Sequence, residues 1–212
     1  MSARLLSSLV ALALGGLLVA GCGGGSGEST ATTSAAGSAS SSTAKQTETE
    51  TGVPAEAQAA ATGDIPDNQQ FLTYQDRSGG YSIRYPEGWA RKGSGKDVAF
   101  QDRANVIHVA IVEGKPPTAS SADAGLEELK REDPSVKSTG AQAITINGAP
   151  VVKVTFTRLS APDPVTGKRL PLTIDRYLYA KAGKVAIVDL GTPVGVDNVD
   201  AYRMISESFQ WL

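Results

Sequence analysis

The sequence predicts an α+β domain in which helices pack on a mainly antiparallel sheet, an α/β/α sandwich. Most of residues 64–212 fall into short segments where apolar and polar side chains alternate with the period of a β-strand. Tight-turn residues separate most of these segments, which favours antiparallel neighbours. Helical periodicity is confined to two segments, near 120–132 and 197–209. Short connections and so few helices favour an antiparallel sheet over a parallel one.

The first core strand is predicted at residues 81–85. Its three large side chains alternate with polar residues and therefore share one face; they are Tyr81, Ile83 and Tyr85. Pro86 ends the strand because it has no N–H to donate, and Gly88 permits a positive φ. We expect this turn to fold Trp89 back onto the aromatic face and to bury most of its indole ring.

Further strands are expected in the first half of the domain, at residues 71–76, 89–92, 98–101 and 105–113. The Gly-rich loop 93–96 joins two of them as a hairpin turn. It does not fit a phosphate-binding loop, because that pattern requires glycine at position 90 and Ser or Thr at position 97, where the chain has Ala90 and Asp97. The strand at 105–113 carries apolar residues on both faces, which indicates that it is covered on both sides.

His108, the only histidine of the chain, lies in the middle of that strand. A site built from nitrogen and sulfur ligands needs several such residues, and the domain has no second histidine and no cysteine. We therefore interpret His108 as a structural residue, packed and hydrogen-bonded. The sequence predicts no metal site and no cofactor site.

The first helix is predicted to run from a cap at Ser120 or Ser121 to about Glu132, with Leu126 and Leu129 facing inward. Several acidic side chains lie near its end and flank basic ones; they are Glu127, Glu128, Glu132 and Asp133. We interpret them as a solvated helix face rather than a cation site.

A meander of four strands is predicted next, at residues 141–146, 151–159, 172–180 and 184–191. Asn147-Gly148 joins the first two, because this dipeptide suits the left-handed positions of a tight hairpin. The second strand has one buried face, made of Val152, Val154 and Phe156. The loop 161–169 is longer than a hairpin requires.

The last element is predicted to be a helix capped by Asp197. Its apolar stripe consists of Val199, Tyr202, Ile205 and Phe209. We expect Trp211 and Leu212 to fix the end of this helix against the rest of the domain.

Residues 1–21 are predicted to be a lipoprotein signal peptide. A short basic region at Arg4 precedes an apolar run, and the run leads into Val19-Ala20-Gly21-Cys22, which matches a bacterial lipobox. Cys22 is the only cysteine, so it has no disulfide partner, and we expect its thiol to carry a diacylglyceryl thioether with acyl chains such as palmitate. The alternative is an ordinary secretory signal in which Cys22 is incidental.

Residues 22–63 are predicted to be a lipidated cysteine followed by a disordered tether. This segment consists mainly of Ser, Thr, Ala and Gly, and it has too few large apolar side chains to offset the entropy lost on ordering. The domain itself is close to neutral, since residues 71–212 carry 18 basic and 16 acidic side chains. A near-neutral exported domain is a poor binder of nucleic acid, so no nucleic-acid partner is expected.

The stretch Gly79-Gly80-Tyr81-Ser82-Ile83-Arg84-Tyr85-Pro86-Glu87-Gly88-Trp89 resembles the PsbP-like family, which includes the extrinsic photosystem II subunit and bacterial lipoproteins of the LpqN type. Residues 175–179, 200–203 and 208–211 are similar to the closing strands and last helix of that family. The resemblance covers about 71–212 and implies a PsbP-like domain over residues 64–212. It also implies that the protein acts by docking on a larger assembly. A fold motif does not by itself establish an activity.

Enzymatic activity is not expected. The chain has no Gly-x-Ser-x-Gly or His-Glu-x-x-His motif, so no catalytic residue is predicted, although a pair of carboxylates brought together by the fold is left open. We expect a lipid-anchored binding or assembly module on the extracytoplasmic face of the cell membrane, with a protein partner. The alternative is a carrier of a small amphipathic ligand, with Tyr85, Tyr177 and Tyr179 lining its pocket. Whether these tyrosines or the loop 161–169 form a binding site is left open.

Overall fold

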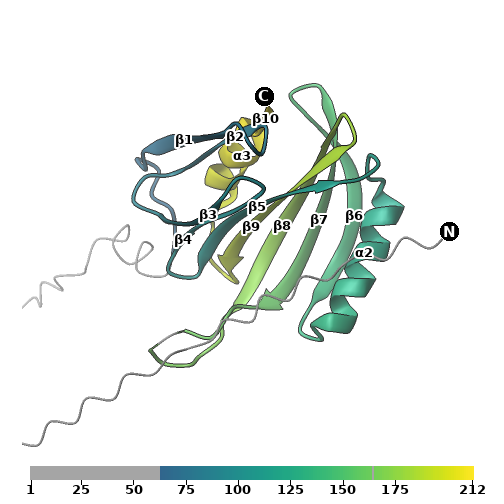
Figure 1. Ribbon diagram of the computed structural model, residues 1–212. Helices are drawn as coiled ribbons and strands as arrows, with labels where there is room; N and C mark the ends of the chain where they lie inside the picture. The colour runs from purple at the N-terminus through teal and green to yellow at the C-terminus, as the bar shows by residue number, and fades with distance from the viewer. Residues whose placement is uncertain (1–62, 164) are drawn as a thin grey trace, which may run out of the picture. The chain divides into compact units, whose positions relative to one another are not determined.

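The computed structural model describes residues 63–163 and 165–212, which form two sheets and two helices (Figure 1). The predicted signal peptide, Cys22 and residues 23–62 of the predicted tether lie outside this part of the chain. No helix within the described ranges is long and apolar enough to cross a membrane.

A seven-stranded sheet forms the body of the domain. Its strand order is β3-β4-β5-β9-β8-β7-β6, and all neighbouring strands are antiparallel. The strands are β3 (Ala90–Ser94), β4 (Asp97–Asp102), β5 (Asn105–Glu113), β6 (Lys137–Ile146), β7 (Ala149–Leu159), β8 (Pro171–Lys181) and β9 (Lys184–Pro193). The predicted meander is confirmed, and Asn147 (φ 50°) and Gly148 (φ 78°) take the left-handed conformations that its first turn requires.

A separate three-stranded sheet contains the predicted first core strand. Its order is β1-β2-β10, with β1 at Phe71–Asp76, β2 at Tyr81–Pro86 and β10 at Gln210–Trp211. Tyr81 and Ile83 are fully buried, as the alternation predicts. Trp89 is only partly buried and packs at the margin of the core, so its ring is more exposed than we expected.

The Asp76 carboxylate fixes the small sheet to the turn between β3 and β4. Its Oδ1 accepts hydrogen bonds from Ser78 Oγ (2.5 Å) and Gly79 N (2.7 Å), and its Oδ2 accepts from Tyr74 OH (2.9 Å) and Gly95 N (2.9 Å). These hydrogen bonds stabilise the charged carboxylate and hold the pKa of Asp76 well below its usual range. The small sheet is therefore held against the large one by polar contacts as well as by the core.

The two helices cover opposite faces of the large sheet, which confirms the predicted α+β class. Helix α3 (Val199–Ser208) packs with the small sheet against one apolar cluster, and α2 (Ala119–Glu132) packs against the other (Figure 1). Helix α2 packs mainly on β6 and β7. The second face of β5 is therefore less covered than its apolar pattern predicts, and Val112 on that face is 43% exposed.

Both helix caps differ from the predicted ones. Thr118 is the N-cap of α2, and its hydroxyl and that of Ser121 bond reciprocally to each other's backbone N–H. The N-cap of α3 is Asn198, one residue after the predicted Asp197, whose carboxylate still accepts a hydrogen bond from Val199 N (3.2 Å). This places Val199 at the first helical position, where it is 72% exposed rather than part of the apolar stripe.

Two buried asparagines attach Gly63 and Ile65 to the fold. The Gly63 carbonyl accepts hydrogen bonds from Asn105 Nδ2 (2.5 Å) and Asn198 Nδ2 (3.3 Å), and Asn198 Oδ1 accepts from Ile65 N (2.8 Å). Asn105 is 2% exposed and Asn198 is 3% exposed. The folded domain therefore begins no later than Gly63, one residue before the predicted boundary.

Candidate functional site

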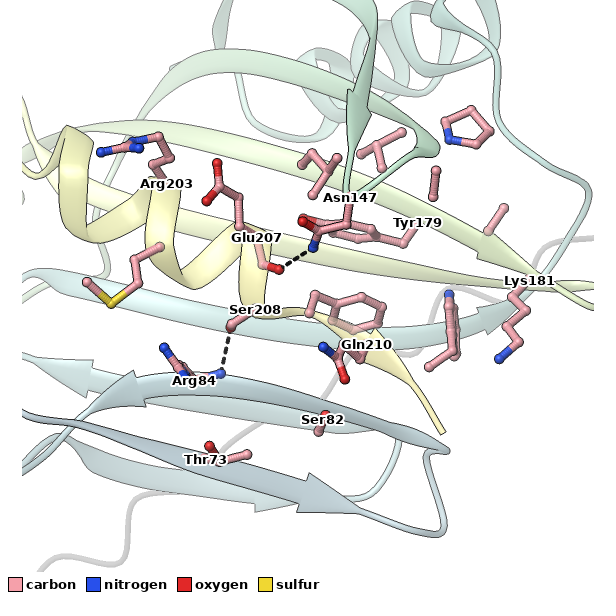
Figure 2. A pocket seen from close by; sticks show the side chains of 18 of the residues that line it. Thr73, Ser82, Arg84, Asn147, Tyr179, Lys181, Arg203, Glu207, Ser208 and Gln210 are labelled. Carbon is pink, nitrogen blue, oxygen red and sulfur yellow. Dashed lines mark hydrogen bonds between the residues drawn. The ribbon is translucent and has the colours of Figure 1, made fainter.

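An open groove of about 1080 Å³ lies where the small sheet, α3 and the ends of β7 and β8 meet. We call it the β10 groove, because residues 209–211 form part of its wall. The outer face of the small sheet and the outer face of α3 form one side, and the β6–β7 hairpin with the end of β8 forms the other (Figure 2). Polar and charged side chains from both sides reach it; they include Arg84, Asn147, Lys181, Arg203 and Glu207.

Two hydrogen bonds attach both sides of the groove to the last turn of α3 (Figure 2). Arg84 N donates to Ser208 Oγ (2.8 Å), which fixes β2 beside the helix end. Asn147 Nδ2 donates to the Glu207 carbonyl (2.6 Å), which fixes the β6–β7 turn from the opposite side. The end of a helix has carbonyl groups without an intrahelical partner, so Asn147 satisfies one that would otherwise be left to water.

An aromatic group forms the inner wall of the groove. The ring of Phe209 stacks on Tyr179 with centroids 4.5 Å apart and meets Trp211 edge to face at 5.4 Å. Tyr179 OH donates to the Ser206 carbonyl (2.7 Å). Burial, with smaller contributions from Tyr177 and Glu207, raises the pKa of Tyr179 well above its usual range, so the phenol stays a neutral donor.

The Trp211 indole Nε1 is buried and has no hydrogen-bond partner. It is the single such side-chain atom among the described residues. A buried donor without an acceptor costs about 1 to 3 kcal/mol, which the packing of the Trp211 ring must offset.

The charges of the groove are only partly paired within the domain. Arg203 forms an ion pair with Asp200 on the same helix (2.9 Å), and both side chains are exposed. Arg84 and Lys181 have no carboxylate partner within residues 63–163 and 165–212. Glu207 is the other acidic residue of the groove and acts electrostatically on Arg203 and Tyr179. The groove thus offers two cations that a bound acidic group can meet.

A second cavity, of about 480 Å³, lies on the other side of α3 against β6 to β9. Its floor carries the Lys153–Asp175 ion pair (2.9 Å), and Asp175 also accepts a hydrogen bond from Thr155 Oγ1 (2.6 Å). The Lys153 amine lies 5.3 Å from the centre of the Tyr177 ring. Burial of this amine lowers its pKa, but the hydrogen bond and charge of Asp175 together with the contribution of Tyr177 outweigh burial, and the pKa of Lys153 is raised. Because Lys153 and Asp175 pair with each other, neither charge is left to bind a ligand.

A third cavity, of about 660 Å³, lies beside the loop 161–169 on the α2 face of the sheet. It includes His108 and Asp189, and Asp189 pairs with Arg176 through two hydrogen bonds of 2.7 and 2.8 Å. His108 Nε2 lies 3.1 Å from Asp97 Oδ1. His108 is therefore hydrogen-bonded, as predicted, but it is only partly buried and not packed in a core.

The three tyrosines proposed for an amphipathic pocket do not gather in one place. Tyr85 stacks on Phe100 with ring centroids 4.1 Å apart and packs against the core. Tyr177 borders the second cavity, whereas Tyr179 borders the β10 groove. The loop 161–169 borders neither of these two sites.

Sequence reasoning did not identify the groove residues Arg84, Lys181 and Glu207. They come from β2, β8 and α3, which are far apart in the chain, and each has the ordinary pattern of an exposed polar position. The Asn147-Gly148 turn was the one relevant signal, but its predicted role was limited to the hairpin. Within the described residues no group of three or more His, Cys, Asp or Glu side chains is arranged to hold a metal ion.

The fold is an antiparallel α+β sheet with a helix on each face, and its open groove is a surface that can hold a ligand or a partner. The family model for PsbP matches residues 69–130. This match covers less than a third of the chain; with the fold, it supports the PsbP-like resemblance that the sequence predicted, and the LpqN type stays a prediction. A search of curated protein sequences finds no significant match.

The chain is also similar to solved structures. The solution structure of cyanobacterial PsbP (CyanoP) from Synechocystis sp. PCC 6803 matches with a TM-score of 0.53 and 18% identity, covering 72% of this chain and 99% of that one. The Saccharomyces cerevisiae Ran-binding protein Mog1p gives a TM-score of 0.46 and 9% identity, covering 68% of this chain and 96% of that one. At these identities the likeness to CyanoP concerns the fold.

Proposed function

We propose that the protein is an extracytoplasmic lipoprotein, anchored to the cell membrane through Cys22, whose β10 groove docks a partner protein. The groove carries this proposal. It is open, it has polar groups on both sides, and it contains two cations without acidic partners in the described domain. Neither side of it presents a nucleophile hydrogen-bonded to a base, so binding fits these side chains better than catalysis does.

The lipobox supports the membrane location. Cys22 has no other cysteine to pair with, and a diacylglyceryl thioether at this position would hold the mature chain on the outer side of the membrane. An LpqN-type lipoprotein has this organisation. The amphipathic-carrier alternative is less well supported, because its three tyrosines do not line a common cavity.

The proposal is tested by site-specific photocrosslinking in intact membranes. A photoreactive amino acid replaces Met204, which is exposed in the groove, or Glu128, which is exposed on α2 outside all three cavities. We expect a discrete crosslinked protein from position 204 and none from position 128. Cys22→Ser should release the protein from the membrane fraction or leave it with an uncleaved signal peptide, which intact-mass measurement distinguishes. Equal crosslinking from both positions would refute docking at the groove.

A further inference from the structure

The β10 groove contains an open strand edge. Strand β10 is the last strand of the small sheet and has a strand neighbour, β2, on one side only. Gln210 is paired with Ser82 and Trp211 with Tyr81, and Leu212 N donates to the Gly80 carbonyl (2.9 Å). Hydrogen bonding alternates along an antiparallel pair, so Gln210 and Leu212 direct their main-chain groups toward β2. The N–H and C=O of Trp211 therefore point to the opposite edge.

That opposite edge is part of the groove. Phe209, Gln210 and Trp211 all line it, and the labelled side chains of Asn147 and Tyr179 lie across from Gln210 (Figure 2). An exposed strand edge presents a donor and an acceptor at the spacing of another strand, which is why extended peptides add to such edges. The edge is short, so main-chain hydrogen bonds alone give little affinity, and side-chain contacts must supply the rest.

The side chains around the edge select for negative charge. Arg84 lies on the small-sheet side of the groove and Lys181 on the side of the large sheet (Figure 2). Neither has a carboxylate partner in the described part of the chain, in contrast to Arg203, which is paired with Asp200. An occupant with acidic side chains would meet both cations and face one carboxylate, Glu207, whereas a basic occupant would meet Glu207 and face both cations.

We propose that the β10 groove binds an extended, acidic segment of a partner protein, which adds to the free edge of β10 and places carboxylates at Arg84 and Lys181. The proposal rests on the docking function above and names the chemistry of the docked segment. Alternating side chains of the added strand face opposite sides of the small sheet, so acidic residues at every second position suit this site. Trp211 lines the same wall, so the NMR signal of its indole N–H can report on occupancy of the groove.

The test uses fluorescein-labelled octapeptides and the full mature chain. The first peptide alternates Thr and Glu, the second alternates Thr and Lys, and the third is the Thr/Glu peptide with N-methyl groups that remove its main-chain donors. Fluorescence anisotropy at low salt gives each Kd. We expect the Thr/Glu peptide to bind at least tenfold more tightly than the other two, and its affinity to fall as salt rises.

Charge reversal locates the site. Arg84→Glu and Lys181→Glu should each weaken binding of the Thr/Glu peptide about three- to tenfold, as expected when an exposed ion pair becomes a repulsion. Lys92→Glu is the matched control, since Lys92 is exposed on β3 and outside the groove, and it should change Kd less than twofold. In the NMR spectrum, the indole N–H signal of Trp211 should shift on adding the peptide, and that of Trp89 should not.

Several outcomes would overturn the inference. Equal affinity for the Thr/Glu and Thr/Lys peptides would exclude charge selection, and equal binding of the N-methylated peptide would exclude strand addition. If vesicles of anionic phospholipid bind with the same dependence on Arg84 and Lys181 while no peptide binds, the occupant is a membrane surface. If position 204 crosslinks a protein in membranes but the peptides show no preference for acidic residues, the docking function stands and this inference is refuted. If the peptides show the expected selectivity but position 204 gives no crosslink, the docking function is refuted instead.

Discussion

Replacing Asn198 by alanine should destabilise the domain through one buried hydrogen-bond network. Asn198 Oδ1 accepts from Ile65 N (2.8 Å), and its Nδ2 donates to Thr192 Oγ1 (2.8 Å), Asn105 Oδ1 (3.2 Å) and the Gly63 carbonyl (3.3 Å). In the variant, Gly63 and Thr192 keep their hydrogen bonds to Asn105, whereas the Ile65 N–H loses its acceptor.

The cost of Asn198→Ala can be estimated from these contacts. An orphaned buried donor costs about 1 to 3 kcal/mol, and the space left by the amide adds about 1 kcal/mol, so we expect a loss of about 2 to 4 kcal/mol. Helix capping adds nothing, because the Asn198 side chain makes no cap hydrogen bond. Urea unfolding of the mature chain measures the loss. Asn68→Ala is the control, since Asn68 is exposed and should change stability by less than about 0.5 kcal/mol.

A truncated chain provides the sharper test of this reasoning. A chain that starts at Pro66 lacks the Gly63 carbonyl and the Ile65 N–H, so Asn198→Ala should cost clearly less there than in the mature chain. If the two costs are equal, or if the loss in the mature chain is below about 1 kcal/mol, Asn198 does not stabilise the domain through these partners.

Three further predictions concern the small sheet and its attachment. The pKa of Asp76 is lowered in the folded state, so the carboxylate contributes its full stabilisation above about pH 5. That stabilisation is lost as the pH falls through the unfolded-state pKa near 4 and below it. Asp76→Asn should therefore flatten the pH dependence of urea unfolding between about pH 5 and 2. Phe100→Ala should cost about 3 to 5 kcal/mol in the same assay, because Phe100 is fully buried between Tyr74 and Tyr85. Trp89→Ala should cost clearly less than Phe100→Ala because Trp89 is only partly buried, and equal losses would contradict this ranking.

The elements were predictable where they depend on local periodicity. The alternation in 151–159 and 184–191, and the Asn147-Gly148 turn, correctly predicted the meander, because strand period and turn conformation are local properties. The separation of β2 into a second sheet was not predictable in this way. Its partner β10 lies more than a hundred residues later in the chain, and no local pattern in β2 indicates that pairing.

The cap positions and the groove show two other limits of sequence reasoning. Thr118 and Ser121 both suit a cap, and their reciprocal hydrogen bonds decide the start of α2. The groove depends on exposed cations such as Arg84 and Lys181, and nothing in the sequence distinguishes these from other solvated residues. Such sites arise from long-range pairing of strands, which a single sequence does not reveal.

The hydrogen bonds from Asn105 and Asn198 to the Gly63 carbonyl determine which elements of the domain bear a force applied along the preceding chain. Any pull transmitted along the chain before residue 63 acts first on the hydrogen bonds to Asn105 in β5 and to Asn198 at the start of α3. The β10 groove is attached at the opposite end of α3, through Ser208 and Glu207, about 15 Å away along a helix of this length. Tension applied along the chain before residue 63 would therefore be borne by β5 and the start of α3, one helix length away from the attachment of the groove.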